Sequence, residues 1–344
     1  MVQQTRPRRR ALGLLAAVAL AAAACGGDDG AGGAEPPEEA DTRLVDTELG
    51  QVEVPLRPER VVALDEYAAL NMMALGHEPV LVFASYQSEV GGVVLDDAGI
   101  EVQAATAEEG PNFEAVAAAL PDLIVYTTEG AVAPSFERLS EIAPAVSLPY
   151  NVPWREAITA TAEVFGEEGE GQRLIGVLED HLAPLQEAVA AEPRSMSVLG
   201  DTYGLVFGAS MDSPLAAVLE EAGFDRPAAQ AEGTPDPTFT AAVVTSLETI
   251  GDHDADLVIV LSGAYYRAET FLEAPTFQVL PAVQDGRSFV VDGDMWFGTY
   301  PFAIYWLVED LRALQAGEGQ EAVGTLDDVD ARWAAFQELS GGAP

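Results

Sequence analysis

Residues 154–191 read WREAITATAEVFGEEGEGQRLIGVLEDHLAPLQEAVAA. Most apolar positions in this stretch recur at intervals of three, four or seven, which is the spacing of one face of an α-helix. The exception is residues 166–171, where acids and glycines predict a kink or a surface turn. We therefore expect one long helix that connects two parts of the chain. The apolar positions that carry this prediction are Ile158, Ala162, Phe165, Leu174, Val177, Leu178, Leu182 and Leu185.

The chain on either side of this helix follows one plan. Apolar runs of strand length alternate with segments of helix length, a pattern that indicates a mostly parallel sheet covered by helices on both faces. Strands are expected at 60–65, 79–83, 100–104, 122–126, 195–200, 256–261 and 288–291. Helices are expected at 66–75, 112–120, 134–142, 214–222, 246–251, 300–314 and 326–339. The sequence thus predicts an α/β fold in which two similar lobes, residues 44–153 and 192–344, are joined by a single long helix, residues 154–191.

The N-terminal segment, residues 1–24, is typical of an export signal. Four arginines precede an apolar run, Ala11 to Ala24, that is too short to span a bilayer. Cys25 is the only cysteine, so it forms no intramolecular disulfide, and the three alanines before it resemble a bacterial lipobox. We expect a protein anchored by lipid to the outer face of the cell membrane, with residues 25–43 as a flexible acidic tether. A soluble secreted protein is the alternative, and general secretion and twin-arginine export both stay open.

The mature chain is strongly acidic. The full chain has 16 basic and 57 acidic residues, and removing the signal takes away four arginines and no acids, so the formal charge becomes 12 − 57 = −45. This charge repels phosphate backbones, which excludes a nucleic-acid-binding protein. It indicates a solvated acidic surface and favours neutral or cationic ligands over anionic ones.

Two glutamates occupy matched positions in the two halves. Each follows a predicted helix N-cap by two positions and precedes by eight the aspartate that opens a strand. A carboxylate in the first turn of a helix is favoured by the helix dipole by roughly 0.3–1 kcal/mol, which is a structural reason for its presence. Two exposed carboxylates at matched points also suit docking onto a two-subunit partner. The repeated residues are Asn112, Glu114 and Asp122 in the first half and Ser246, Glu248 and Asp256 in the second.

Sequence signatures of catalysis are missing. The chain has no phosphate-binding loop, no G-x-S-x-G and no H-E-x-x-H motif, so we expect no enzyme and no resident cofactor. A carboxylate pair among the many acids would make a surface-anchored hydrolase, which is the alternative from another class. The three histidines, His77, His181 and His253, lie away from the carboxyl ends of strands, where open parallel sheets bind ligands. We therefore expect no metal site.

The segments at the ends of the predicted strands are rich in aromatic residues. Carboxyl ends of parallel strands meet at one edge of a sheet, and binding residues concentrate on loops held by such a scaffold. Aromatic side chains gathered there predict a binding surface for a bulky ligand. The candidate ligand-binding residues are Tyr86, Tyr126, Trp154, Tyr203, Phe207, Tyr266, Arg267, Trp296, Phe297 and Tyr300.

Together these features resemble the siderophore and cobalamin group of ABC-transporter substrate-binding proteins, over about residues 44–315. The resemblance rests on Cys25 with its tether, the connecting helix, the opening RVVAL at 60–64, the repeated E-x7-D-L pattern, and LPAV and VVD at 280–283 and 290–292. It implies two lobes whose closure is restricted by the connecting helix, with the ligand in a shallow cleft between them. It also implies that one glutamate per lobe docks into an arginine pocket of an ABC permease dimer, and by motif these are Glu114 and Glu248.

The resemblance further implies a monomeric carrier of a ferric siderophore. Anionic catecholate complexes need several basic cleft residues, whereas Arg267 is the one cation expected there. A neutral or cationic hydroxamate complex, held by aromatic faces and tyrosine hydroxyls, fits the sequence better. A haem or cobalamin carrier of the same fold is the nearest alternative, and a purely structural envelope lipoprotein is another.

Overall fold

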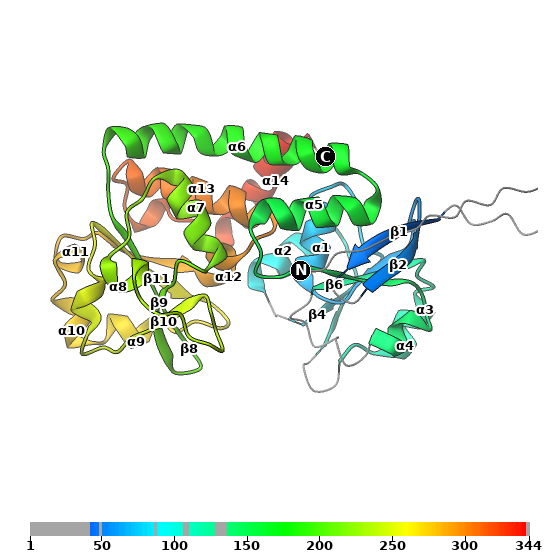
Figure 1. Cartoon of the computed structure of the whole chain (residues 1–344), viewed down its shortest axis with the longest axis horizontal. Helices are drawn as coiled ribbons and strands as arrows, with labels where there is room; N and C mark the ends of the chain where they lie inside the picture. The colour runs from blue at the N-terminus through cyan, green and yellow to red at the C-terminus, as the bar shows by residue number, and fades with distance from the viewer. Residues whose placement is uncertain (1–41, 48–49, 86–87, 106–109, 128–135, 342–344) are drawn as a thin grey trace, which may run out of the picture. The chain divides into compact units, whose positions relative to one another are not determined.

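The computed structural model of the chain describes residues 42–47, 50–85, 88–105, 110–127 and 136–341 (Figure 1). The predicted export signal and Cys25 lie outside these residues. Within the described ranges, no helix has both the length and the apolar character needed to cross a bilayer.

The first lobe is an α/β unit. Its strands are β1 (Thr42–Thr47), β2 (Gly50–Pro55), β3 (Val61–Ala63), β4 (Leu81–Ala84), β5 (Val102–Ala104), β6 (Leu123–Thr127) and β7 (Ala145–Leu148). Its helices are α1 (Glu66–Met73), α2 (Glu89–Asp97), α3 (Phe113–Ala118) and α4 (Phe136–Ser140). The order β5-β4-β3-β6-β7 makes a parallel five-stranded sheet. Val61 and Ala63 pack with α1 on one face and Val62 packs with α3 and α4 on the other, which confirms a parallel sheet covered on both faces.

Sequence reasoning missed α2, β7 and the hairpin of β1 and β2. The helix α2 contains Gly91 and Gly92, and two adjacent glycines lower helix propensity by about 2 kcal/mol relative to alanine. The hairpin has few buried residues, notably Val45 and Val54. These two side chains pack in one cluster with the side chains of β3. Short or glycine-containing segments of this kind give a weak periodic signal, although their few apolar residues enter the core.

The second lobe repeats the plan with one change. Its strands are β8 (Met196–Thr202), β9 (Leu205–Ala209), β10 (Ala242–Val244), β11 (Leu257–Ser262) and β12 (Ser288–Asp292), in the order β10-β9-β8-β11-β12. Strands β8, β11 and β12 are parallel, whereas β9 and β10 are antiparallel to their neighbours. The change starts at the two-residue turn Tyr203-Gly204, where both φ angles are positive, 50° and 87°. Such a turn joins adjacent antiparallel strands, so β9 returns beside β8 instead of crossing over.

Helices cover both faces of the second sheet. Met196 and Val198 pack with α7 and α13, whereas Val258 and Val260 on the other face pack with α9, α10 and α11. The helices of this lobe are α7 (Pro214–Ala222), α8 (Ala228–Ala231), η2 (Ile250–His253), α9 (Glu269–Leu272), α10 (Pro275–Gln278), α11 (Pro281–Gln284), α12 (Gly293–Phe297), α13 (Pro301–Gln315), η3 (Gln320–Ala322), η4 (Leu326–Asp328) and α14 (Val329–Ser340).

The predicted connecting helix is α6 (Glu168–Ala191), whose 24 residues span about 36 Å. The expectation that it continues back to Trp154 is wrong, because residues 154–165 form a separate helix, α5 (Trp154–Phe165). Figure 1 shows α5 packed alongside α6, with the chain reversing between them. Gly166 allows the reversal by adopting φ 69°, and the Glu167 N–H donates to the Ala162 carbonyl to close the helix end.

The last two long helices brace the lobes against each other. Helix α13 packs on α6 and on α1 of the first lobe, and α14 packs on α2 (Figure 1). Trp333 and Phe336 of α14 belong to the same buried cluster as Val90 and Val94 of α2. The buried Asp310 accepts from the Gly324 N–H at 2.9 Å and pairs with Arg332 at 2.8 Å, which fixes α14 on α13.

Replacing Gly171 tests the contact between α5 and α6. A Cβ at Gly171 would lie 2.6 Å from the Ala162 Cβ, so Gly171→Ala must push the helices apart. We expect it to lower the free energy of unfolding by about 1–3 kcal/mol. Gly176, also on α6, has no such neighbour within 4 Å, so Gly176→Ala is the matched control and should be neutral or stabilise by up to about 1 kcal/mol. Equal urea midpoints for the two variants would contradict this packing.

Candidate functional site

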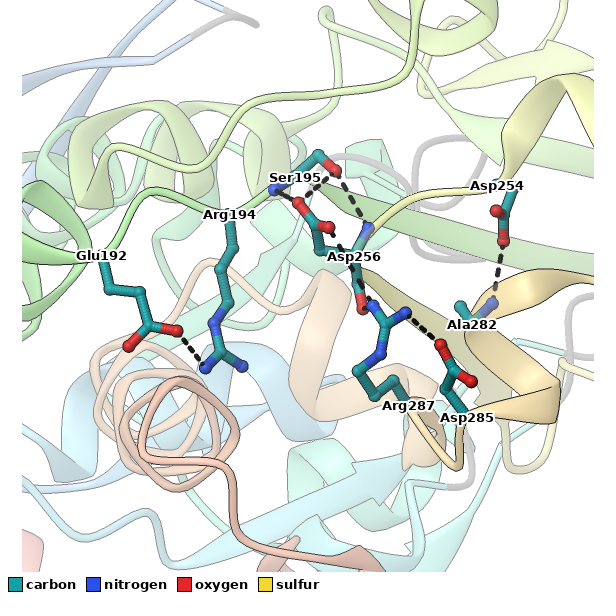
Figure 2. A network of polar contacts seen from close by, with 8 residues as sticks. All are labelled: Glu192, Arg194, Ser195, Asp254, Asp256, Ala282, Asp285 and Arg287. Carbon is teal, nitrogen blue, oxygen red and sulfur yellow. Dashed lines mark hydrogen bonds and ion pairs between the residues drawn. The ribbon is translucent and has the colours of Figure 1, made fainter.

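The repeated E-x7-D pattern contains one structural residue and one exposed residue. In the first lobe the Asp122 carboxylate accepts from the backbone N–H groups of Glu59 at 2.7 Å and Arg60 at 3.0 Å, just before β3. In the second lobe Asp256 accepts from the backbone N–H and the hydroxyl of Ser195, both at 2.9 Å, just before β8 (Figure 2). Each aspartate therefore ties the start of β6 or β11 to the start of the neighbouring central strand.

The side chains around Asp256 also have a structural role. Figure 2 shows Arg287 beside Asp256, where it donates to the Asp256 carbonyl oxygen and pairs with Asp285 at 2.8 Å. Hydrogen bonds from Ser195 keep the pKa of Asp256 below its ordinary value. These groups lie at the amino ends of the strands, so they stabilise the sheet at the edge opposite the candidate ligand-binding residues.

The two glutamates of the pattern are exposed. Asn112 caps α3 as predicted, because its side-chain oxygen accepts from the Glu114 N–H at 3.0 Å. The helix expected from residue 246 is wrong: Glu248 lies in a turn, and η2 begins only at Ile250. Hydrogen bonds from its own backbone N–H and from the Ser246 hydroxyl lower the pKa of Glu248. Both carboxylates are therefore presented at the surface, one from a helix and one from a turn.

Three stacked tyrosines bring the carboxyl ends of the two sheets together. Tyr67, in α1 directly after β3, stacks on Tyr150, which follows β7, with ring centroids 5.5 Å apart. Tyr67 also stacks on Tyr300 of the second lobe at 5.5 Å. Burial raises the pKa of Tyr67 and of Tyr300 well above the ordinary value, so both hydroxyls stay protonated. The stack marks the place where loops of both lobes meet.

A second aromatic group lies in the second lobe. Tyr266 and Phe297 are partly buried, with ring centroids 5.9 Å apart, and both contact the buried Phe207, at 6.4 and 6.2 Å. Tyr266 also lies against Gly293, where a Cβ would come within 2.1 Å of its ring. The two partly exposed rings thus rest on a packed core, with Phe207 behind them.

Three sequence-predicted ligand residues are placed inside the lobes. Tyr126, Trp154 and Trp296 have exposed fractions of 1%, 2% and 0%. Tyr126 packs among the side chains between the first sheet and α3 and α4. Trp296 donates its indole N–H to Asp310 at 2.9 Å, within the brace that holds α14. Their burial gives them a packing role whatever else they do.

The remaining predicted ligand residues differ in exposure. Tyr203 is 88% exposed in the turn between β8 and β9, and Tyr86 lies outside the described residues. Arg267 follows β11 and donates to both carboxylate oxygens of the buried Asp201, at 3.0 Å each. Burial opposes ionisation of Asp201, but hydrogen bonds from Thr270 and Arg267 outweigh it and lower its pKa. The charge of Arg267 is therefore already matched by a carboxylate.

Buried acids organise the carboxyl edge of the first lobe. Asp65 accepts from an N–H of α1 at 2.7 Å and from the Thr127 N–H at 2.6 Å, so it caps α1 and joins the ends of β3 and β6. Burial raises the pKa of Asp65 to about 6. Glu66 accepts from the N–H groups of Ser85 at 2.9 Å and Ser88 at 3.2 Å, which ties α1 to the loop after β4.

Two further acids lie at the carboxyl end of β12 in the second lobe, Asp292 as its last residue and Asp294 just after it. Asp292 caps α12 by accepting from the Met295 N–H at 2.9 Å. Asp294 is 7% exposed, and its carboxylate makes no hydrogen bond or ion pair with any residue in the described ranges. Burial raises the pKa of Asp294 to about 7, and repulsion from Asp292, Glu66 and Glu89 adds to the shift. Acids of both lobes therefore approach one another beside the tyrosine stack.

The histidines have local partners. His77 and His181 each lie beside a glutamate, at 3.0 and 3.3 Å. His253 is buried, with its Nδ1 3.2 Å from the side-chain nitrogen of Gln230. Across the described segments of the chain, no group of three or more histidine, cysteine, aspartate or glutamate side chains is placed to hold a metal ion.

Sequence reasoning missed Tyr67, Tyr150 and the acids Glu66 and Asp294 as site candidates. All four residues follow closely on strands, at the carboxyl edge of a sheet. That position could have marked them as candidate site residues. With 57 acids in the chain, however, nothing in the sequence separates two at the junction of the lobes from the solvated ones. Only the packing of the lobes distinguishes them.

The sequence matches the family described as "Periplasmic binding protein" over residues 61–295. A curated relative, the probable siderophore-binding lipoprotein YfiY of Bacillus subtilis, is 27% identical over 272 residues, which cover 74% of this chain and 82% of the relative. The petrobactin-binding protein YclQ of Bacillus subtilis aligns in structure with a TM-score of 0.66 at 18% identity, covering 80% of this chain and 98% of that one. Staphylococcus aureus SirA, solved with staphyloferrin B, aligns with a TM-score of 0.65 at 22% identity, covering 81% and 100%. These structures confirm the predicted two-lobed α/β fold.

Stability should fall as the pH rises from about 4 to about 8. The pKa values of Asp65 and Asp294 are raised to about 6 and about 7, so the folded chain holds protons that the unfolded chain releases. Their contribution is complete below pH of about 4 and is lost as the pH passes through the folded-state pKa values. Because one pKa unit corresponds to about 1.4 kcal/mol, each group contributes up to a few kcal/mol.

Replacing Asp294 measures how much this residue contributes to the pH dependence of stability. Asp294→Asn removes the titration, so the variant should lose less stability than the wild type between pH 5 and pH 8. Asp330→Asn, which removes an exposed carboxylate on α14, should keep the wild-type slope. Urea unfolding at fixed pH values measures both, and a wild-type slope in Asp294→Asn would contradict a raised pKa at this position.

Proposed function

The chain belongs to the periplasmic binding protein family, and we propose that it captures a ferric siderophore outside the cytoplasm and delivers it to an ABC importer. Family membership makes it a binding protein and not an enzyme, as the missing catalytic motifs predict. YfiY is named as a probable siderophore-binding lipoprotein and YclQ as a petrobactin-binding protein. Those names, together with the shared fold, support a siderophore as the cargo.

The proposed contact surface is the set of loops at the carboxyl ends of both sheets. Tyr266 and Phe297 offer partly exposed aromatic faces there, and the stack of Tyr67 and Tyr300 joins the lobes. Covering one large aromatic side chain contributes roughly 1.5–3 kcal/mol. Three or four such contacts, less the cost of association, correspond to about micromolar affinity or tighter.

The other predicted ligand residues are proposed to act in two ways. Phe207, Trp154, Trp296 and Tyr126 are buried and support the surface from behind. The exposed Tyr203 is proposed to contact the ligand directly, and Tyr86 remains a candidate by its place after β4.

The observation that favours a hydroxamate is the charge of these loops. Among the described residues that follow the parallel strands of both sheets, up to the next helix or strand, the one basic residue is Arg267. Its guanidinium is paired with Asp201, so little positive charge is available to an anionic ligand. A ferric catecholate complex carries several negative charges, whereas a ferric trihydroxamate core is neutral. We therefore propose a neutral or cationic ferric hydroxamate as the cargo.

Ligand titration tests the cargo. Quenching of intrinsic tryptophan fluorescence is measured with ferric hydroxamates, ferric catecholates, haem and cobalamin. We expect saturable one-to-one binding of a ferric hydroxamate with a Kd of about micromolar or lower, and no binding of catecholates at that concentration. Binding of the catecholate alone would contradict the charge argument, and binding of haem or cobalamin alone would identify a different cargo.

The two exposed glutamates are proposed to dock onto the permease dimer. Glu114 and Glu248 occupy equivalent places in the duplicated lobes, and each precedes an aspartate that is used within its own lobe. Glu248 also lines a surface groove together with Asp254, Thr276 and several apolar residues, including Val279, which is 70% exposed. An exposed charge beside an apolar surface is typical of a protein–protein contact.

Removing both glutamates tests docking. The double variant Glu114→Ala with Glu248→Ala should lose uptake in a transport assay while its affinity for the ferric hydroxamate stays within about twofold of the wild type, because neither side chain is among the proposed ligand contacts. Glu187→Ala with Glu338→Ala removes two exposed glutamates from α6 and α14 and serves as the control, with uptake unchanged. Uptake at the wild-type rate in the first variant would exclude these residues from docking.

The anchor is proposed from the sequence. Residues 1–24 are removed on export, Cys25 is lipidated, and the segment from Cys25 to β1 tethers the binding protein to the outer face of the cell membrane. The expectation that the tether reaches residue 43 is wrong, because Thr42 and Arg43 belong to β1 and Arg43 donates to the Pro55 and Leu56 carbonyls. The relative YfiY is named a lipoprotein, which supports this arrangement.

A further inference from the structure

Asp294 is a largely buried acid at the junction of the lobes, and its carboxylate has no partner among the described residues. Its residue is 7% exposed, and within the described ranges no hydrogen bond or ion pair reaches its side-chain oxygens. Buried carboxylates in folded proteins are normally hydrogen-bonded or paired, because an uncompensated one costs several kcal/mol. The carboxylate oxygens are not among the fully enclosed unpartnered atoms of the described residues, so water or a bound group can supply the missing partner.

The charged groups around Asp294 are all acidic. Asp292, from its own loop, and Glu66 and Glu89, from the first lobe, each raise its pKa by repulsion. Two of these neighbours are already used: Asp292 caps α12, and Glu66 holds the loop after β4. Glu89 is exposed to solvent, so Asp294 is the largely buried acid of this group whose oxygens remain available, in a field that attracts positive charge.

A second unpaired group lies on the side of the first lobe. The Ser85 hydroxyl is buried without a hydrogen-bond partner, and the Ser85 N–H donates to Glu66 at 2.9 Å. The aromatic rings of Tyr67 and Tyr300 stack on each other beside these acids. Burial raises the pKa of both tyrosines, and the negative charge of Asp294 adds to the shift. Tyr67 and Tyr300 are buried, whereas the partly exposed ring of Tyr266 lies against Gly293, beside Asp294 in the chain. An aromatic ring next to a carboxylate suits an organic cation, since the ring quadrupole attracts positive charge as well.

We propose that this junction binds a positively charged group of the cargo, an ammonium or similar organic cation, and that Asp294 is its carboxylate partner. The inference rests on the proposed function and narrows it to ferric hydroxamates with a cationic arm. The iron keeps the oxygen ligands of the siderophore, and Asp294 contacts only the arm. A bare metal ion does not fit, because among the described residues no three potential ligands converge.

Two ligands that differ in one charge test the proposal. Ferrioxamine B has a neutral ferric trihydroxamate core and a free ammonium end, and its N-acetyl derivative lacks that charge. We expect the wild-type protein to bind ferrioxamine B at least about tenfold more tightly, as a charge-assisted hydrogen bond implies. Asp294→Asn should bring the two affinities within about twofold of each other by weakening ferrioxamine B alone. Asp330→Asn, the surface control, should retain the wild-type difference.

The possible outcomes separate the inference from the function on which it rests. Equal binding of both complexes by the wild type, or an unchanged preference in Asp294→Asn, would overturn the role of Asp294 and leave the siderophore carrier intact. Binding of neither complex would overturn the hydroxamate proposal and the inference together. Wild-type affinity of Asp294→Asn for the N-acetyl complex shows that the variant is folded, so a lost preference is then due to the charge.

The pH dependence gives an independent readout. In the wild type the affinity for ferrioxamine B should fall as the pH drops below about 7, because protonated Asp294 no longer attracts the ammonium group. In Asp294→Asn, and with the N-acetyl complex, this dependence should disappear. The same fall in Asp294→Asn would overturn the assignment to this carboxylate. The titratable groups that face Asp294 are Asp292, Glu66, Glu89, Tyr67, Tyr265 and Tyr300.

Discussion

The packing of α13 and α14 of the second lobe against α1 and α2 of the first determines how the two sheets meet. Trp333 and Phe336 share one buried cluster with Val90 and Val94, and each buried side chain of this size contributes roughly 1.5–3 kcal/mol. We infer that these helices, together with α6, hold the lobes at a nearly fixed angle, so the ligand must fit a site that is already formed.

The way the lobes meet sets the chemistry of the junction. Because the carboxyl ends of both sheets face the same region, the stack of Tyr67 and Tyr300 crosses from one lobe to the other beside Asp294. The carboxylates of Asp65 and Glu66 already accept hydrogen bonds from the loops of the first lobe, and Asp201 is already paired with Arg267. What remains is an aromatic surface with unbalanced negative charge. That combination suits a bulky ligand without negative charge and disfavours a catecholate complex.

Much of the fold was predictable from the sequence because its strands are continuous apolar runs with helices between them. The central strands β3, β6, β8 and β11 and the helices α1, α7 and α13 lie within a few residues of their expected places. The connecting stretch was harder, since acids and glycines at 166–171 predict a kink or a surface turn, and only the left-handed conformation of Gly166 reveals that α5 folds back on α6. The turn at Tyr203 and Gly204 decided the antiparallel edge of the second sheet in the same local way.

The candidate site was predictable only in part. Position after a strand was enough to select Tyr266, Phe297 and Tyr300, but it could not separate exposed rings from buried ones such as Trp296, because burial depends on the packing of α12 to α14. Glu66 and Asp294 could not be singled out in the sequence, because the chain has 57 acidic residues. Their importance comes from desolvation and from neighbours on the other lobe, and neither property has a local signature in the chain.

Native mass spectrometry of the protein purified from its own host would test the cargo most directly, because a retained ligand is identified by its mass and iron content. We expect one ferric complex per chain whose net charge is zero or positive and whose iron ligands are hydroxamates. A retained anionic catecholate complex, or haem or cobalamin, would contradict the proposed chemistry of the junction between the lobes.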